Sequence, residues 1–426
     1  MTPCSSLATW LAYLEALHPQ AIDLGLDRVR TVWQRLGSPR PAPVCITVGG
    51  TNGKGSTVAF LSAMLGSAGH LVGSYTSPHL LRYNERVRIG GEDASDAQLV
   101  AAFAEIDAAR GDVSLSYFEF GTLAAFLVLA RAGLDVAVLE IGLGGRLDAV
   151  NLIDADAAIL TSVDLDHQEF LGNTREQIGW DKAHIFRRGR PAILAALDPP
   201  ETVFRVAQGM GAELWVLPPT TDAGEADWTC PLPDAAPLRL PPPTLSAPCQ
   251  RRNATAAIWA WWCLRDHLRF DAAAAAEGVA LARVRGRLER LPRRIETIVD
   301  VAHNPEAARE LARWLQRHPR EPNVAVFAAL GDKDLAGIVR PLRQAFAAWI
   351  VCDLRTVSPR AADPANQATA LRALGAAGNI EVADGEAMSQ ALAQADEHAG
   401  AAGRIVVFGS FFTVAAALST CEHPAS

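Results

Sequence analysis

Short apolar runs alternate along this chain with longer stretches in which apolar residues recur at helical spacing. The segment LATWLAYLEAL (7–17) shows that spacing, so we expect the first ~40 residues to be mainly helical. Buried strands of the parallel type are predicted at VCITV (44–48), DVAVLEI (135–141) and AAILTSV (157–163). Amphipathic helices are predicted at 54–69, 120–132 and 174–187. This alternation is typical of an α/β domain with a mostly parallel sheet.

A second round of alternation begins near residue 295. Its apolar runs are IETIVDVA, NVAVFAAL, AWIVCDL and GRIVVFGS, and a helical stretch follows each of them. We therefore predict two domains, 1–285 and 286–426, the second within the usual size range of a domain. The proline-rich segment 217–248 cannot be regular helix. It is either irregular or edge structure of the first domain or a lead-in to a helix at 253–268, and a flexible connection is an equal alternative.

Composition narrows the class of protein. Half of the 426 residues are hydrophobic and 20% are charged, so a sizeable core can be buried. The net charge of −8 argues against a nucleic-acid surface. A signal peptide begins with basic residues, whereas no Lys or Arg precedes Arg28. The longest apolar runs are too short to span a bilayer. Seven cysteines without a C-x-x-C pair predict reduced thiols, so we expect a cytoplasmic protein with neither nucleic-acid nor membrane partners.

The segment GGTNGKGST (49–57) lies between a predicted strand and a predicted helix. A glycine-rich turn in that position presents backbone N–H groups to an anion, and the helix N-terminus adds partial positive charge. Lys54 can then reach the outer phosphates of a nucleotide, although Gly55 separates it from the Ser56 hydroxyl. The segment therefore favours nucleotide binding, with a purely structural turn as the alternative.

The sequence GTNGKGS resembles the ATP loop of the Mur ligase superfamily, and more closely that of its folate branch, the folylpolyglutamate and dihydrofolate synthases. Further motifs of that family follow in order along the chain: IDLGLDRV (22–29), YTSPHLLRYNERVRI (75–89), YFEFGTL (117–123), LEIGLGGRLDAVN (139–151), TSVDLDHQEFLG (161–172), IGWDKAHIFR (178–187), RNATAA (252–257), GRLE (286–289), DVAHNP (300–305), GDKD (331–334) and FGSFFTVA (408–415). The resemblance implies a P-loop-type, mostly parallel sheet in an N-terminal ATPase domain and a smaller Rossmann-like α/β domain after it.

The resemblance also implies a reaction, the ATP-dependent formation of an amide. A carboxylate is a poor electrophile, so it is first phosphorylated by ATP, and the amine of L-glutamate then attacks the acyl phosphate. Phosphoryl transfer needs positioning and charge neutralisation more than covalent help from the protein. ATP and two Mg²⁺ ions are the implied cofactors. The expected acceptors are 7,8-dihydropteroate and reduced folates, and likeness to the family suggests a monomer.

Four residues are the implied metal ligands, Ser77, Glu140, His167 and Lys182, of which Lys182 resembles a lysine that is carbamylated. Taken alone, each has a simpler interpretation. Glu140 ends an apolar strand, so an exposed strand end is an equal alternative, and a lone histidine such as His167 is more often structural. Ser77 precedes a proline and would usually be a turn residue. A helical lysine such as Lys182 is normally solvated. A lysine whose pKa is lowered by burial or nearby charge can, however, react with CO₂. Lys54, Glu140, His167 and Lys182 form the predicted catalytic set.

Nucleotide contacts are predicted in the segment 49–57, which we call the phosphate loop, and near the domain boundary. They are Thr51, Asn52, Gly53, Lys54, Gly55, Ser56, Asn253, Arg287, Asp300 and His303. Asn253 has a simpler interpretation as a helix N-cap, and Arg287 as a linker charge. By resemblance, ATP is held between the two domains, whose closure would exclude water from the acyl phosphate.

The dihydropteroate contacts rest almost wholly on the resemblance. They are Asp23, Leu24, Gly25, Arg82, Ser116, Tyr117, Phe118, Glu119, Leu147, Asp148 and Ala149. From the residues alone, GLGGRLDA suits either a close backbone approach to a ligand or a tight turn. Rival functions are a monofunctional folylpolyglutamate synthase, a cell-wall Mur ligase, for which no N-terminal uridine-nucleotide domain fits before residue 49, and a non-enzymatic nucleotide-binding protein.

Overall fold

The computed structural model describes residues 6–18, 20, 23–219, 227–383, 385 and 388–422. It divides the chain into two compact units, of which the first comprises 1–244 and 250–283 and the second 245–249 and 284–426. Relative to the predicted division at 285/286, the short segment 245–249 thus packs with the second unit. Residues 220–226 of the proline-rich segment lie outside the described residues, and the part that follows them forms a two-stranded hairpin.

The first unit holds ten strands and ten α-helices within the described residues. The strands are β1 (Val44–Gly49), β2 (Val72–Tyr75), β3 (Val87–Ile89), β4 (Glu92–Asp93), β5 (Val136–Glu140), β6 (Ala157–Leu160), β7 (Pro191–Leu194), β8 (Glu213–Val216), β9 (Trp228–Leu232) and β10 (Ala235–Leu240). The helices are α1 (Leu7–Leu17), α2 (Asp27–Arg35), α3 (Lys54–Ser67), α4 (Asp96–Arg110), α5 (Tyr117–Ala130), α6 (Gln168–Leu171), α7 (Arg175–Ala183), α8 (Glu201–Met210), α9 (Gln250–Cys263) and α10 (Ala272–Leu281), with 3₁₀ turns η1 (Tyr83–Arg86) and η2 (Ala149–Leu152).

The main sheet of this unit has the strand order β4-β3-β2-β5-β1-β6-β7-β8. Strands β2, β5, β1, β6, β7 and β8 are parallel, while β3 and β4 add an antiparallel edge. The register sets Val48 beside Glu140 and Gly49 beside Leu160, so the chain leaves β1, β5 and β6 at one edge of the sheet. Open parallel sheets bind ligands outside the carboxyl ends of their strands. That edge is therefore where a site is expected.

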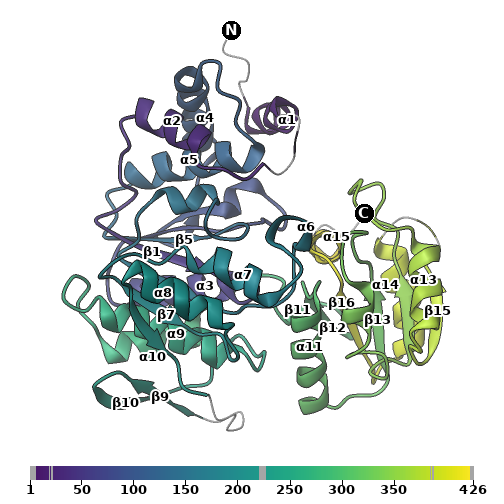
Figure 1. Ribbon diagram of the computed structural model, residues 1–426. Coiled ribbons are helices and arrows are strands. Elements are labelled where there is room, and N and C mark those ends of the chain that lie inside the picture. The colour runs from purple at the N-terminus through teal and green to yellow at the C-terminus, as the bar shows by residue number, and fades with distance from the viewer. Residues whose placement is uncertain are drawn as a thin grey trace. The chain divides into compact units, whose positions relative to one another are not determined.

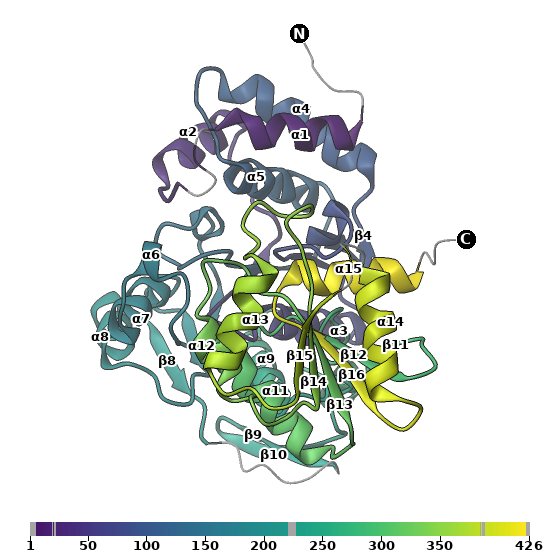
Figure 2. The same ribbon diagram turned by 90° about the vertical axis from the view of Figure 1, so that its right-hand side faces the viewer.

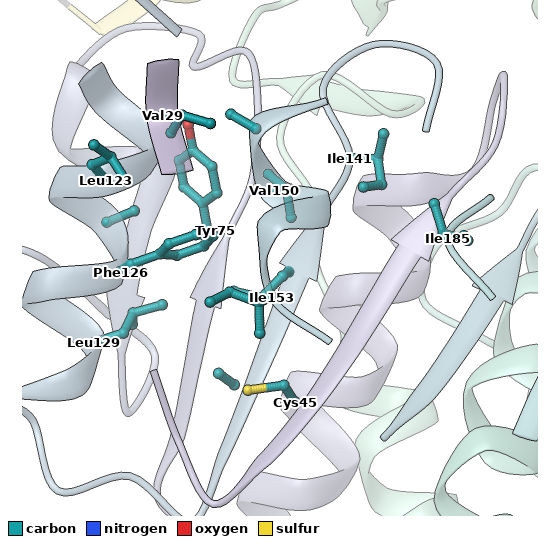
Figure 3. Packing of buried hydrophobic residues seen from close by; sticks show 14 of the residues in the cluster. Val29, Cys45, Tyr75, Leu123, Phe126, Leu129, Ile141, Val150, Ile153 and Ile185 are labelled. Atoms are coloured by element: carbon teal, nitrogen blue, oxygen red, sulfur yellow. The ribbon is translucent and has the colours of Figure 1, made fainter. Parts of the chain in front are cut away.

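Both faces of the central strands are buried, which explains their continuous apolar runs. Helices α1, α2, α4 and α5 lie together at one end of the unit (Figure 1; Figure 2). Their apolar side chains join one core cluster with those of the sheet, in which Leu123, Phe126 and Leu129 of α5 face Tyr75 of β2 and Ile153 (Figure 3). Helices α3 and α9 pack against strands of the same sheet, and α10 packs on α3.

The second unit is a smaller α/β fold. Its elements are β11 (Glu289–Leu291), β12 (Glu296–Asp300), α11 (Pro305–Arg317), β13 (Asn323–Phe327), α12 (Leu335–Val339), β14 (Ala348–Val351), α13 (Pro364–Ala373), β15 (Asn379–Val382), α14 (Met388–Ala399), β16 (Arg404–Phe408) and α15 (Phe411–Glu422). The sheet order is β11-β12-β16-β13-β14-β15, parallel except for β11. The predicted α/β class is thus confirmed for both units.

Several predicted elements end earlier than the apolar pattern suggests, among them the helix predicted to run to residue 268, which ends at Cys263. At two of the others, local hydrogen bonds show the reason. The strand predicted to run to residue 163 stops at Leu160, because Thr161 and Ser162 turn to bond the phosphate loop. The helix predicted to run to 187 stops at Ala183. There the carbonyl oxygen of His184 accepts hydrogen bonds from Asn151 and Arg187 side chains, which replace the missing helical donors. Within the described part of the chain, no helix combines the length and apolarity needed to cross a lipid bilayer.

The contact of α10 with α3 depends on Gly278, and this yields a stability prediction. A Cβ at Gly278 would collide with the backbone N and Cα of Met64, whereas one at Gly66 of α3 would meet no atom within 4 Å. Gly278→Ala should therefore destabilise the protein by about 1–3 kcal/mol, as overpacking does. Gly66→Ala, the matched control, should stabilise it by roughly 0.4–1 kcal/mol. Urea unfolding of both variants measures the difference, and equal stability of the two would contradict the packing described.

Candidate active site

The phosphate loop follows β1 and has a conformation that only glycine permits at two positions. Gly50 has φ +146° and Gly53 has φ +85°. A Cβ at Gly50 would collide with Oγ1 of Thr161, and one at Gly53 would lie 2.7 Å from Oδ1 of Asn253. Helix α3 starts directly after Gly53, at Lys54. The first turn of α3, with its unpaired N–H groups, therefore opens onto this loop.

The two residues that follow β6 anchor the loop. The Thr51 amide donates to the Ser162 carbonyl (2.9 Å), and the Asn52 amide donates to Oγ of Ser162 (2.9 Å). The Thr161 hydroxyl donates to the Asn52 carbonyl at 2.6 Å. These bonds fix the loop against the neighbouring strand. The sequence analysis missed Thr161 and Ser162 because they read as the end of an apolar strand.

Two lysines meet at one oxygen of this loop. Nζ of Lys54 and Nζ of Lys182 each donate to the Gly50 carbonyl at 3.1 Å, and Lys54 also donates to the Thr51 carbonyl at 3.1 Å. Lys182, on α7, is only 5% exposed. Burial, reinforced by the positive charge of Lys54, lowers the pKa of Lys182 to about 7. The structure thus brings together residues separated by more than a hundred positions in the chain.

Glu140 lies at the carboxyl end of β5 and is buried beside the start of α3. Its Oε2 accepts a hydrogen bond from the Ser77 amide (3.3 Å), and a Cβ at Gly55 would lie 3.6 Å from the same oxygen. His167 precedes α6 in a left-handed conformation (φ +50°), with Nε2 4.0 Å from Oδ2 of Asp166. No group of three or more His, Cys, Asp and Glu suited to a metal was found among the described residues. A hard divalent cation here would therefore take further oxygens from Ser77 and from bound phosphate.

Helix α9 supports the loop from the side of Gly53. The Gln250 amide donates to Oγ of Ser56 (3.2 Å), and Asn253 donates to Oε1 of Gln250 (3.0 Å). Arg252 fixes the start of α9 by donating to the carbonyl oxygens of Ala195, Ala196, Leu217 and Pro218, at the ends of β7 and β8. Gln250 and Arg252 were not predicted, because nothing local in the sequence distinguishes them from ordinary helical residues.

Arg28 joins two of the predicted dihydropteroate-binding residues. Its guanidinium lies 2.6 Å from Oδ2 of Asp23 and donates to Oε1 of Glu119 at 3.0 Å. The other carboxylate oxygen of Glu119 accepts from the amide of Ser116, the N-cap of α5. Leu24 and Gly25 continue from Asp23 and are half-buried. Arg28 thus ties the segment before α2 to the start of α5.

The other predicted pocket residues surround the loop after β5. A Cβ at Gly142 would collide with the ring of Phe118, and Tyr117 contacts Tyr83 edge to face. Leu147 and Ala149 flank Asp148, which is fully buried and accepts from the amides of Leu143 (2.8 Å) and Val150 (2.9 Å). Arg82 points elsewhere, because it is exposed and its Nη2 lies 3.9 Å from Oδ1 of Asp96.

In the second unit, the predicted nucleotide contacts gather at the carboxyl end of β12. Half-buried Asp300 accepts from the amides of Leu288 (3.0 Å) and Ala302 (2.9 Å). Burial raises its pKa, and the positive charge of Arg287 opposes the rise. The Arg287 guanidinium lies 5.7 Å from the ring centroid of Phe411, and the His303 ring lies 5.6 Å from the same centroid. Phe411 is a further member of this group that the sequence analysis did not select.

Comparison with known proteins adds to this geometry. Residues 48–223 match the model of the Mur ligase middle domain, and residues 286–411 match that of the Mur ligase glutamate ligase domain. The dihydrofolate synthase/folylpolyglutamate synthase of Escherichia coli is 43% identical over 419 residues, which cover 96% of this chain and 94% of the relative.

The chain belongs to the dihydrofolate synthase/folylpolyglutamate synthase family of Mur ligases.

Solved structures of this family share its fold over nearly the whole length. Escherichia coli FolC in complex with DHPP and ADP has a TM-score of 0.91 and 40% identity, covering 100% of this chain and 99% of that one. A bifunctional folylpolyglutamate synthase/dihydrofolate synthase with Mn, AMPPNP and L-glutamate bound has a TM-score of 0.87 and 40% identity, covering 99% of this chain and 100% of that one. The family predicted from the motifs is therefore confirmed.

The buried carboxyl of Asp148 predicts a pH dependence. Burial raises the pKa of Asp148 to about 7 from an ordinary value near 3.8, although backbone hydrogen bonds and Lys54 oppose the rise. The folded state therefore holds this proton where the unfolded state has released it, so the stability contributed by Asp148 falls as pH rises from about 4 to about 7.

The variant Asp148→Asn lacks this titration. We compare the unfolding free energies of the unchanged protein and the variant at each pH. The difference, unchanged protein minus variant, should decrease as the pH rises from 4.5 to 7, by at most about 1.4 kcal/mol per pH unit. Chemical unfolding at a series of pH values measures this difference. A difference that is constant over the window, or that grows with pH, would show that the carboxyl is ionised in the folded protein.

Proposed function

We propose that this protein is an ATP-dependent ligase that joins L-glutamate to 7,8-dihydropteroate, forming dihydrofolate, and to reduced folates, forming folylpolyglutamates. The observation that carries the proposal is the convergence of Lys54 and Lys182 on the Gly50 carbonyl, beside the start of α3 and buried Glu140. The cation Lys54, a helix N-terminus and a buried carboxylate lie together at the end of a parallel sheet, and such a set is suited to polyphosphate and its metal ions. Relatives and solved structures of the family agree with this activity in their names and bound ligands.

The proposed chemistry has two steps. A carboxylate oxygen of the acceptor attacks the γ-phosphorus of ATP, and ADP leaves. The amino group of glutamate then attacks the acyl carbon, loses a proton, and displaces inorganic phosphate, which carries away one of the original carboxylate oxygens. Lys54 and the amides of Thr51, Asn52, Gly53, Gly55 and Ser56 are proposed to hold the phosphates in line for the first step.

Ser77, Glu140, His167 and Lys182 are the proposed metal ligands. Their oxygen and nitrogen donors suit Mg²⁺, and two such ions, when bound, supply positive charge to the phosphate oxygens. Because the pKa of Lys182 is lowered to about 7, a good part of its amine is neutral near neutral pH. A neutral amine can add CO₂ to form a carbamate, so carbamylation of Lys182 is part of the proposal.

The remaining predicted residues keep their proposed roles in substrate binding. Asn253 in the first unit, and Arg287, Asp300 and His303 in the second, are proposed nucleotide contacts. Asp23, Leu24, Gly25, Ser116, Tyr117, Phe118, Glu119, Leu147, Asp148 and Ala149 are proposed to contact the pteridine acceptor, and Arg82 is the weakest member of that set because its side chain lies toward Asp96. The proposed assembly state is a monomer.

Phosphate release with ATP and glutamate tests the function, with 7,8-dihydropteroate or tetrahydrofolate as the acceptor. Release with both, accompanied by the matching amide products, is the expected result. Release with tetrahydrofolate alone would favour the monofunctional folylpolyglutamate synthase instead. Release with neither acceptor would contradict the proposal. Lys54→Ala should lower kcat by at least about 10²–10³-fold, the usual effect of removing one group that stabilises transition-state charge.

Chemical rescue tests the role of Lys182. Lys182→Ala should lose activity to a similar extent, and acetate should restore part of it, because a small carboxylate can fill the place of the carbamate. Lys54→Ala is the matched control, since acetate cannot replace a cation and should not rescue it. Mass spectrometry of the native protein should show the added mass of one CO₂. Equal rescue of both variants, or of neither with no added mass, would argue against carbamylation.

A further inference from the structure

Arg86 is a buried cation without a carboxylate partner in the described structure. It ends the turn η1 and is 9% exposed. No Asp or Glu forms an ion pair with it among the described residues, whereas nearby Arg28 contacts both Asp23 and Glu119, and Arg88 contacts Asp93. Burying a guanidinium is costly unless an anion or good hydrogen bonds compensate it. Its surroundings therefore require an explanation.

Neutral groups hold Arg86 in place. Its Nε donates to Nδ1 of His79 at 2.8 Å, so this ring nitrogen is an acceptor and the imidazole is neutral. The guanidinium carbon lies 5.1 Å from the ring centroid of Tyr83 and 5.6 Å from that of Tyr117. Two aromatic faces and one imidazole orient the group but bring no negative charge.

The hydrogen-bond partners of Arg86 are all neutral. Its Nε donates to His79, and the guanidinium also hydrogen-bonds the buried hydroxyl of Tyr75. A planar guanidinium held at these two points presents its remaining N–H groups in a fixed direction, and such groups match the oxygens of a carboxylate. Arg86 is thus preorganised for a carboxylate that the protein itself does not provide.

The position of Arg86 relates it to the proposed acceptor pocket. On one side, the Arg86 carbonyl accepts a hydrogen bond from the Thr76 amide, and the partner of Arg86, His79, lies two residues after Ser77. The amide of Ser77 in turn donates to Glu140. On the other side, Tyr117 begins α5 and is followed by Phe118 and Glu119. Arg86 therefore lies between the segment at the proposed phosphate-transfer site and the wall of the proposed pocket.

We infer that Arg86 binds a carboxylate of the pteridine acceptor. This inference rests on the proposed function, because it takes the acceptor from it. Two carboxylates are possible sources. One is the carboxylate to be ligated, which both acceptors carry. The other is the α-carboxylate of the glutamate in a reduced folate, which 7,8-dihydropteroate lacks.

Steady-state kinetics of Arg86→Gln, with each acceptor in turn, test the inference. The KM for the acceptor should rise about ten- to a hundred-fold, the usual effect of losing a charge-assisted bidentate contact, while the KM for ATP changes less than about two-fold. A rise with both acceptors identifies the carboxylate to be ligated. A rise with tetrahydrofolate alone identifies the α-carboxylate of its glutamate. Arg88→Gln is the matched control, a neighbouring half-buried arginine already paired with Asp93, and should leave both KM values unchanged.

A structural role for Arg86 would give a different result. Unchanged acceptor KM values, a fall in kcat alone, or equal rises in KM for acceptor and ATP would overturn the inference. If Arg86→Gln does not fold, as circular dichroism would show, Arg86→Lys decides by the same ratio of KM values, because lysine keeps the charge but loses the fork. If the unchanged protein turns over neither acceptor, the proposed function itself is refuted. Failure of the proposed function can therefore be told apart from failure of the inference about Arg86.

Discussion

The Gly50 carbonyl accepts hydrogen bonds from Lys54 and Lys182, and the chemistry that we propose for the first unit depends on this shared contact. Two ammonium groups 3.1 Å from one oxygen repel each other, and burial removes most of the water that would screen them. The protein meets this constraint by lowering the pKa of Lys182 to about 7, while the negative charges of Asp166, Asp181 and Asp148 partly offset the repulsion. An anion at this place would relieve the remaining repulsion, which is why we regard it as the phosphate site.

The fold supplies this geometry through contacts between distant segments. Parallel pairing brings the ends of β1, β5 and β6 to one edge of the sheet, so the loop after each strand contributes to the same place. Thr161 and Ser162 hold the loop from one side, and Gln250 on α9 holds the first turn of α3. Arg252 in turn fixes α9 by donating hydrogen bonds to four carbonyl oxygens. These bonds satisfy the guanidinium donors, but no described carboxylate forms an ion pair with Arg252.

Sequence reasoning recovered the parts of this site that have local signals. The loop around Lys54 was predicted from its glycines between a strand and a helix, and Glu140, His167 and Lys182 were predicted from the motif resemblance. The α/β class followed from apolar runs of strand length. Arg28 and Arg86 could not be found in this way, because their partners Glu119 and Tyr117 are far along the chain and any surface arginine looks the same in sequence. Thr161 and Ser162 were hidden for another reason, since β-branched and small residues also suit a strand end.

The most direct test of the account follows one oxygen atom. If the acceptor carboxylate is phosphorylated before glutamate attacks, 7,8-dihydropteroate labelled with ¹⁸O in its carboxylate must pass one labelled oxygen to inorganic phosphate in each turnover. Mass spectrometry of the phosphate released with ATP and glutamate measures this transfer. Labelled phosphate, in proportion to the dihydrofolate formed, is the predicted result. Unlabelled phosphate alongside normal amide formation would contradict the acyl-phosphate mechanism and the role assigned to the Gly50 site.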